Sequence, residues 1–233
     1  MSHNRINIMN KLTLFVVLIS LHSSVFALSF TPTAPEWGTW GEMCQARYVV
    51  SGAGVNSIFA NKVAKSTVKR WKRKMQAAWY GLHHYCAGLI LVNQGKPSHA
   101  IKEFDFTLAR VPTDHYLHAE IMTRIAMAYF ELGQKEEANT FFDTAISQHN
   151  QLPQGYIGKA ITLRKDKQLT KAIEILVKGD KNTEHMSAEI NYHLGLAYYD
   201  NKQYERSKQH ANIAYELGYP LQGLRRKLNQ INK

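Results

Sequence analysis

The sequence predicts an all-α protein, built as a stack of about four helix-turn-helix repeats. One observation is a pair of small residues, twelve positions apart, that recurs at a period of about 34 residues. The aligned pairs are Gly88 with Ala100, Ala126 with Ala138, Ala160 with Ala172, and Gly195 with Ser207. The other observation is that each unit shows an apolar pattern of helical period, a polar turn and a second helical pattern. Such a repeat indicates units that bury their apolar faces against one another.

Residues 1–27 have the features of a secretory signal. Arg5 and Lys11 give a basic start, Leu12–Leu21 is an apolar run, and residues 25–27 (Val-Phe-Ala) offer small residues at the cleavage positions. We therefore predict an exported protein, either periplasmic or secreted. The alternative is an uncleaved segment that anchors the chain in the inner membrane, which the interruption of the apolar stretch by His22, Ser23 and Ser24 disfavours.

Residues 28–80 form an aromatic and basic region ahead of the repeats. Prolines and glycines break any long helix before Glu42, so we expect extended chain followed by one helical piece. Trp37 and Trp40 lie three residues apart in this segment. Either they anchor the segment to the repeats through their large apolar area, or they stack on a sugar-like ligand.

Positive charge is concentrated in the same region. The formal net charge of the chain is +11, and residues 44–102 contain ten Lys or Arg and no Asp or Glu. Apolar side chains recur mostly every three or four residues from Phe59 to Leu82, which predicts a basic helix with one apolar face. The basic patch consists of Lys62, Lys65, Lys69, Arg70, Lys72, Arg73 and Lys74.

Two interpretations of this basic patch stay open. Its cations form the solvated side of a helix that caps the repeats, or they contact anionic lipid headgroups or an acidic envelope polymer. Nucleic acid is disfavoured as a partner, because no recognised binding module is present and export removes the usual substrate.

Residues 81–218 hold the four repeats. Small residues at the helix crossings allow the two helices of each repeat to approach closely. Gly95 and Gly133 suit a left-handed turn at the end of a first helix. Lysines replace them in the last two repeats, where the preceding Asp166 and Asn201 are expected to take that conformation.

Residues 219–233 are predicted to form a capping helix, from Pro220 to Asn232. The leucines expected to cover the apolar face of the last repeat are Leu221, Leu224 and Leu228, at spacings of three and four.

The repeats resemble the tetratricopeptide repeat family, whose pattern places Leu-Gly (or Ala), Tyr, Ala, an aromatic and Ala at fixed offsets. The last repeat carries Leu194, Gly195, Tyr198, Tyr204 and Ala214 in phase. The second repeat carries Ala126, Tyr129, Gly133, Ala138, Phe142 and Ala145. The resemblance covers roughly residues 81–220 and implies a right-handed superhelical stack. The string His83-His84-Tyr85-Cys86, followed by Gly88 and Leu89, also resembles a segment that precedes such repeats in small exported bacterial proteins.

The resemblance implies a binding site, because in this family the first helix of each repeat lines a concave surface that holds a partner's peptide. The groove residues carried over are Tyr85, Leu89, Met127, Phe130, Ile157, Ile161, Arg164, Tyr192, Leu196 and Tyr199. This set is mainly apolar and lacks the Lys and Asn combination with which some members clamp a terminal carboxylate. It predicts a protein partner that presents an apolar or amphipathic segment. The alternative is a groove that is shallow or filled by residues 28–60.

The two cysteines, Cys44 and Cys86, are expected to form one disulfide bond, because an even number in an exported chain of this size favours pairing. Two unpaired thiols are the alternative. A catalytic thiol is disfavoured, because the sequence around Cys86 shows no nucleophile turn.

The sequence contains no recognisable catalytic motif, and we predict no catalytic residue, no metal site and no cofactor. His83 and His84 diverge by about 100° on a helix, so a packed histidine is expected rather than a metal ligand. The predicted function is that of a non-enzymatic exported scaffold or adaptor for protein–protein interaction in the cell envelope. The alternative function is binding of an acidic polymer or a membrane surface through residues 62–74.

Overall fold

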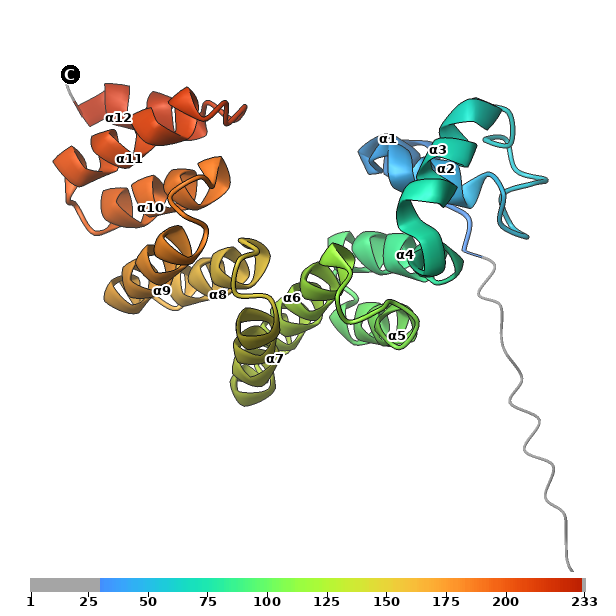
Figure 1. Cartoon of the computed structure of the whole chain (residues 1–233), viewed down its shortest axis with the longest axis horizontal. Coiled ribbons are helices and arrows are strands. Elements are labelled where there is room, and N and C mark those ends of the chain that lie inside the picture. The colour runs from blue at the N-terminus through green and yellow to red at the C-terminus, as the bar shows by residue number, and fades with distance from the viewer. Residues whose placement is uncertain (1–29, 232–233) are drawn as a thin grey trace, which may run out of the picture.

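The computed structural model describes residues 30–231, so the predicted signal lies outside the described residues. Within this range the chain forms twelve α-helices, one 3₁₀ helix and no strands. The helices are arranged as a crescent whose two ends curve to the same side (Figure 1). The predicted all-α repeat fold is confirmed. None of the described helices combines the length and the apolar character needed to cross a membrane.

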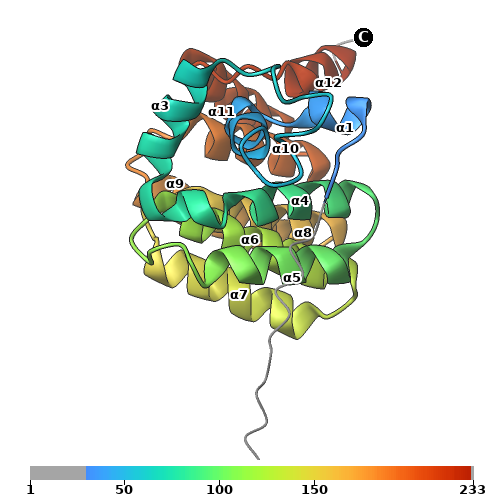
Figure 2. The same ribbon diagram turned by 90° about the vertical axis from the view of Figure 1, so that its right-hand side faces the viewer.

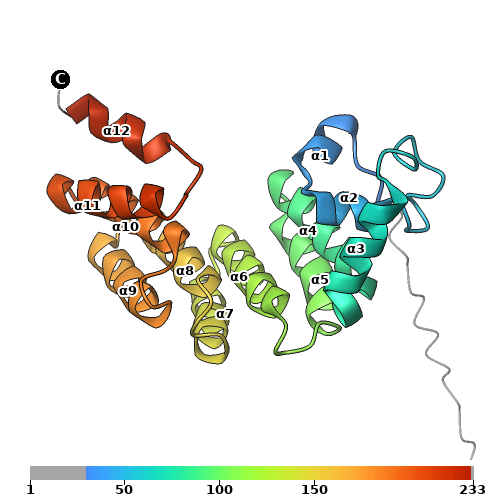
Figure 3. The ribbon, with the colours of Figure 1, turned by 45° about the horizontal axis from the view of Figure 1, so that its top comes forward.

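The elements follow one another as helical pairs between two terminal parts. The N-terminal module, residues 30–80, contains α1 (Ala34–Thr39), α2 (Glu42–Tyr48), α3 (Lys65–Met75) and the 3₁₀ helix η1 (Gln76–Tyr80). The four repeats are α4 (Leu82–Asn93) with α5 (Pro97–Leu108), α6 (Tyr116–Glu131) with α7 (Lys135–Gln148), α8 (Gln154–Lys165) with α9 (Leu169–Asn182), and α10 (Ala188–Asp200) with α11 (Tyr204–Glu216). The last helix is α12 (Gly223–Ile231), at the opposite end of the stack from α1–α3 (Figure 3).

The small residues predicted at the helix crossings are buried there. Ala100, Ala126, Ala160 and Ala172 are each 0% exposed. In the last repeat Ser207 takes this place, and its hydroxyl donates to the Gly195 carbonyl oxygen at 2.7 Å. A larger side chain at these positions would separate the two helices, so the recurring small residues set the spacing of each pair.

The turns inside the repeats share one hydrogen-bond pattern. After α6, the amide of Gly133 donates to Phe130 and the next amide donates to the Tyr129 carbonyl. This is the arrangement that closes a helix with one residue at positive φ. Gly95 and Gly133 occupy that position, with φ of 68° and 78°, as predicted.

The last two repeats keep this turn without glycine. Lys167 and Lys202 adopt φ of 63° and 57°, so the expectation that Asp166 and Asn201 would do so is wrong. The reason is the hydrogen-bond pattern, which fixes the left-handed position one residue after the helix cap, whatever side chain is there. A lysine in this conformation is strained by about 1 kcal/mol.

The N-terminal module contains one more helix than predicted. Pro35 stands in the first turn of α1, and Thr33 and Glu36 form a reciprocal capping box, which explains why six residues suffice for this helix. Trp40 is 6% exposed, and the ring of Trp37 stacks on Phe59 at 4.4 Å. Trp40 also donates to the Cys86 carbonyl oxygen of α4, in agreement with the predicted anchoring role, whereas the Trp37–Phe59 stack lies within the module.

The basic helix is shorter than the apolar spacing suggested. α3 ends at Met75, because Gln76 takes φ of 47°, and the predicted continuation from Phe59 to Leu82 is wrong. Glu42 of α2 accepts hydrogen bonds from Arg70 and from the Trp71 indole of α3, at 2.9 Å for the indole. α3 therefore packs on α2 and leaves its basic side in solvent.

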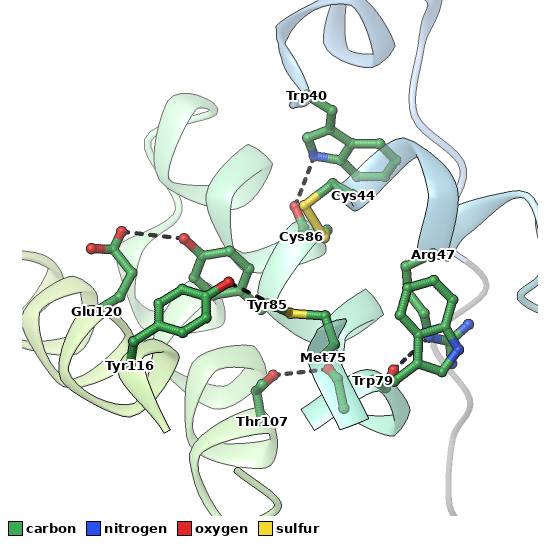
Figure 4. The surroundings of a disulfide bond; sticks show 11 residues. Trp40, Cys44, Arg47, Met75, Trp79, Tyr85, Cys86, Thr107, Tyr116 and Glu120 are labelled. Atoms are coloured by element: carbon green, nitrogen blue, oxygen red, sulfur yellow. Dashed lines mark hydrogen bonds between the residues drawn. A yellow bond between two sulfur atoms is a disulfide. The ribbon is translucent and has the colours of Figure 1, made fainter. Parts of the chain in front are cut away.

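A disulfide bond between Cys44 and Cys86 joins α2 to α4, as predicted (Figure 4). The two Cα atoms are 5.6 Å apart, and 42 positions separate them in the sequence. Beside the bond, Trp40 Nε1 donates to the Cys86 carbonyl oxygen at 3.0 Å, and Arg47 Nε donates to the Trp79 carbonyl oxygen at 2.8 Å. The disulfide and the Trp40 hydrogen bond thus fix the N-terminal module to the first repeat, and the Arg47 hydrogen bond joins α2 to η1 within the module.

The C-terminal cap differs from its prediction in one residue. Leu224 and Leu228 of α12 are 0% and 7% exposed and pack on the last repeat. Leu221 precedes the helix and is 57% exposed, so its expected role in the cap is wrong. Only the two residues within the helix, four apart, share the buried face.

Candidate partner-binding groove

The first helices of the repeats lie on the inner side of the crescent. α4, α6 and α8 face the inside of the curve, and α5, α7 and α9 lie outside them (Figure 1). Contacts between side chains connect α4 to α6, α6 to α8 and α8 to α10 on this inner side. The predicted groove residues lie on these helices, as the resemblance implied.

The ten predicted groove residues differ in exposure. Tyr85, Ile157 and Tyr192 are 5%, 6% and 7% exposed, so they are mainly part of the core. The partly exposed members are Leu89, Met127, Phe130, Ile161, Arg164, Leu196 and Tyr199. Within the second group, Leu89, Met127, Phe130 and Ile161 lie on the first three repeats, whereas Leu196 and Tyr199 pack against the C-terminal cap.

A polar bridge crosses the inner surface between the first two repeats. Glu120 Oε1 accepts from the Tyr85 hydroxyl at 3.2 Å (Figure 4) and from Arg124 Nε at 2.7 Å. Burial raises the pKa of Tyr85, so its hydroxyl stays protonated and donates to the carboxylate. Arg124 was not predicted as a site residue. The sequence could have indicated it, because Arg124 lies four residues after Glu120 on one helix, a spacing at which opposite charges pair.

The inner surface of the last repeat is covered by the chain's own C-terminal segment. The Tyr219 ring stacks on Tyr192 at 4.3 Å, and Lys227 of α12 lies 5.1 Å from the centre of the Tyr199 ring. Burial, together with the nearby Glu189 carboxylate, raises the pKa of Tyr219 to about 12.

Residues 28–60, which were the alternative occupant of the groove, pack at the N-terminal end of the stack in the part that the structure describes. Their hydrogen bonds to the rest of the chain reach α3 and the end of the stack, at Arg70, Trp71, Trp79, Tyr80, His83, Cys86 and Gln94. The part of the inner surface left for a partner is therefore that of the first three repeats.

A pocket opens on this remaining surface, between the first and second repeats. Its volume is about 410 Å³. The lining residues are Val92, Gly95, Pro97, Arg124, Met127, Ala128 and Glu131. Met127 is a predicted groove residue, and Val92 is 38% exposed. The mixture of apolar walls with one cation and one carboxylate suits an amphipathic segment.

Ion pairs connect neighbouring repeats along the edge of the groove. Glu131 pairs with Lys165, and Lys135 pairs with Asp166 at 2.6 Å. Arg164, predicted as a groove residue, donates from Nε to Asp200 at 2.9 Å. Its guanidinium thus holds the third and fourth repeats in register, and exposed pairs of this kind contribute about 0–1 kcal/mol each.

The histidines near Cys86 are packed side chains. His84 is 8% exposed, and its Nδ1 lies 2.6 Å from Glu103 Oε2. Burial lowers the pKa of His83 to about 4, and the adjacent Arg47 adds to this shift. Among residues 30–231 no group of three or more His, Cys, Asp or Glu side chains could hold a metal ion.

Comparisons with known proteins found one family model and several solved structures that are similar to parts of this chain. A model of the tetratricopeptide repeat family matches residues 119–148, which cover most of α6 and all of α7. A solved structure of MamA from Desulfovibrio magneticus RS-1, residue 41 to the end, is 21% identical; the match covers 68% of this chain and 85% of that chain, with a TM-score of 0.46. Another MamA crystal structure is 18% identical over 64% of this chain and 83% of that chain, with a TM-score of 0.43. No curated protein matches the chain.

Repeat stacks of this kind serve as scaffolds for protein–protein interaction, generally without catalysis, because their extended concave surfaces suit the binding of another chain. Four helical pairs share one crossing geometry and one turn pattern, and the second pair matches the family model directly. The second helical pair is therefore a tetratricopeptide repeat, within a stack of four helical pairs that share its turn pattern.

Proposed function

We propose that this protein is a non-enzymatic scaffold of the cell envelope that holds a protein partner by an apolar or amphipathic segment laid along the inner surface of its first three repeats. The observation that carries the proposal is the line of partly exposed apolar side chains on α4, α6 and α8. Leu89, Met127, Phe130 and Ile161 belong to it, and it continues into the 410 Å³ pocket. Apolar side chains aligned over several elements are typical of a surface that another chain covers.

The edge of the groove supports an apolar contact rather than an ionic one. Glu131, Arg164 and Lys165 are already neutralised by partners in neighbouring repeats. A partner segment would therefore gain mainly from burial of apolar area, and its binding should depend little on ionic strength.

Export to the periplasm or the extracellular space is part of the proposal. The Cys44–Cys86 disulfide supports it, because such bonds persist in oxidising compartments. Sequencing the N-terminus of the protein from its native host is the test. A chain beginning at Leu28 is the expected result, whereas a chain beginning at Met1 in the cytoplasmic fraction would refute export.

The test of the groove is a double variant, Met127→Glu with Ile161→Glu, which places two charges on the partly exposed inner surface. The matched control is Thr140→Glu with Val177→Glu, which adds the same charge at exposed positions of the outer helices α7 and α9. Affinity capture with chemical crosslinking from native envelopes, at low and at high salt, measures the partner retained.

We expect one discrete protein to be captured by the parent and by the control at both salt concentrations, and to be lost in the inner-surface variant. Equal capture by both variants would show that the partner does not bind along the inner surface, and the groove proposal would be wrong. The melting temperatures of the two variants must be compared first, so that loss of capture is not confused with unfolding.

A further inference from the structure

We propose that the N-terminal module carries a second docking surface, and that this surface binds the anionic phospholipids of a membrane. It consists of the solvent side of α3 together with the exposed apolar residues beside it, and we call it the basic end face. The inference goes beyond the scaffold function, because none of its residues belongs to the groove.

The basic end face carries cations that the protein does not neutralise. All seven residues of the basic patch are exposed. Within residues 30–231 only Arg70 of this patch forms an ion pair, with Glu42. The remaining cations of α3 (Lys65, Lys69, Lys72, Arg73 and Lys74) therefore present a field of one sign to the solvent.

Three of these cations surround one hollow. It has a volume of about 490 Å³ and is lined by Lys69, Lys72, Arg73, Gln76, Ala77 and Tyr80. Ammonium and guanidinium groups around a hollow, with an amide and a phenol at its rim, are suitable donors for a phosphate oxygen. A second hollow of about 330 Å³ shares Lys72 and Tyr80 and includes Val50. The anionic group of a lipid headgroup has the chemistry to occupy the first hollow.

Exposed apolar side chains distinguish a membrane from an acidic polymer. Ile58 is 79% exposed, Tyr80 68%, Val55 51% and Val50 45%. The turn-rich segment 49–64 that carries three of them lies beside α3 at the N-terminal end of the molecule, facing the viewer in Figure 2. Such side chains gain free energy by entering the interfacial region of a bilayer, whereas a hydrated polymer offers them no apolar medium.

The basic end face and the groove can be occupied together. The end face lies on the N-terminal module, at one end of the crescent, and the groove lies along its inner side (Figures 1 and 3). A membrane bound at this end leaves α6 and α8 accessible. Stable binding needs both attractions, because neither a few cations nor a few small apolar side chains suffices alone.

The experiment measures binding to lipid vesicles by the chain that begins at Leu28. Every contact described above is made within residues 30–231, so this chain keeps the fold and lacks the apolar run of the signal. Vesicles of phosphatidylcholine with phosphatidylglycerol are compared with vesicles of phosphatidylcholine alone. The first variant is Lys69→Gln with Lys72→Gln and Arg73→Gln. Its matched control is Lys171→Gln with Lys178→Gln and Lys181→Gln, three exposed lysines of α9.

We expect the parent and the control to bind the anionic vesicles and to release them at salt concentrations where the screening length falls to about 3 Å. The first variant should bind on the order of 100-fold more weakly, because each cation near an anionic surface contributes about one factor of five. Equal binding by this variant and the control, or binding to phosphatidylcholine alone at the same affinity, would overturn the proposal.

A second variant separates lipid from polymer. Val55→Ser with Ile58→Ser keeps every charge and every residue that lines the hollow, and it should weaken binding to anionic vesicles while leaving binding to polyglutamate unchanged. If polyglutamate is bound tightly and the vesicles are not, the partner is an acidic polymer and the membrane proposal is wrong. The combined fluorescence of the four tryptophans, all of which lie in the N-terminal module, checks that the module is still folded in each variant.

Discussion

Gly88 of α4 lies directly against the ring of Phe104 of α5, so close that a Cβ atom on Gly88 would stand 2.5 Å from the ring carbon Cε1. Phe104 is 0% exposed and has no free space to move into. The same relationship joins Gly158 to Phe142 and Gly179 to Tyr156, at 2.9 Å and 2.7 Å. A glycine therefore faces a large buried aromatic ring at three helix contacts of the described chain.

The first prediction concerns this contact. Gly88→Ala should destabilise the protein by about 1–3 kcal/mol, because overpacking against a fixed ring outweighs the better helix propensity of alanine. Urea unfolding measures the change. Gly38→Ala is the control, because a Cβ there meets no atom within 4 Å and the residue lies in α1. A Gly88→Ala protein as stable as the parent would show that the two helices can separate freely.

The second prediction concerns the strained turns. Lys167→Gly should stabilise the protein by about 0.5–1 kcal/mol, because relief of the left-handed strain exceeds the added entropy of the unfolded chain. The same change at Lys202 should have a similar effect. Asp166→Gly, one residue earlier, should instead destabilise, because Asp166 has a negative φ of −78°, which puts no strain on it, and it pairs with Lys135. Thermal denaturation of the three variants distinguishes the two positions in the turn.

The third prediction concerns the disulfide bond. Replacing Cys44 and Cys86 by alanine should reduce stability by about 4 kcal/mol, because the bond closes a loop of 42 residues in the unfolded chain. The four tryptophans are Trp37, Trp40, Trp71 and Trp79, so their fluorescence reports on the N-terminal module alone. This signal should be lost at lower urea than the helical circular dichroism of the repeats. Coincident transitions would mean that the module and the repeats unfold as one unit.

The fourth prediction concerns pH. Burial, with the nearby Arg164 cation, lowers the pKa of His193 from 6.5 to about 4. Between these two values the unfolded chain binds more protons than the folded chain, so His193 reduces stability as the pH falls from 6.5 toward 4. In His193→Leu the free energy of unfolding should fall less between pH 7.5 and pH 5 than it does in the parent. The difference between the two decreases should be about 1–2 kcal/mol. An identical pH dependence in both proteins would contradict this.

Much of the fold follows from local regularities. The spacing of small residues placed all four helical pairs, because close helix crossings tolerate nothing larger, and Ala100 and Ser207 occupy such crossings in the structure. The apolar periodicity also identified the capping helix and its buried Leu224 and Leu228.

Predictions were wrong where two local signals competed. Apolar spacing favoured one helix from Phe59 to Leu82, yet the chain turns before Lys65 and again at Gln76. The helix ends where Gln76 takes a positive φ, just after Met75, which is buried in the core shared by the N-terminal module and the first repeat. The left-handed conformation of Lys167 was likewise predicted for Asp166 instead, because residue type alone favours Asp over Lys in that conformation.

The sequence by itself determined the repeat, the pairing of its helices and the position of the basic patch, because these depend on periodicity and composition. The candidates for the groove came from the resemblance to the tetratricopeptide repeat family. Only the tertiary structure decided which groove residues are accessible. Tyr192 is covered by Tyr219, and Arg164 is engaged by Asp200, 36 positions away. Exposure and pairing depend on contacts between distant segments, and a linear pattern contains no information on the distances between them.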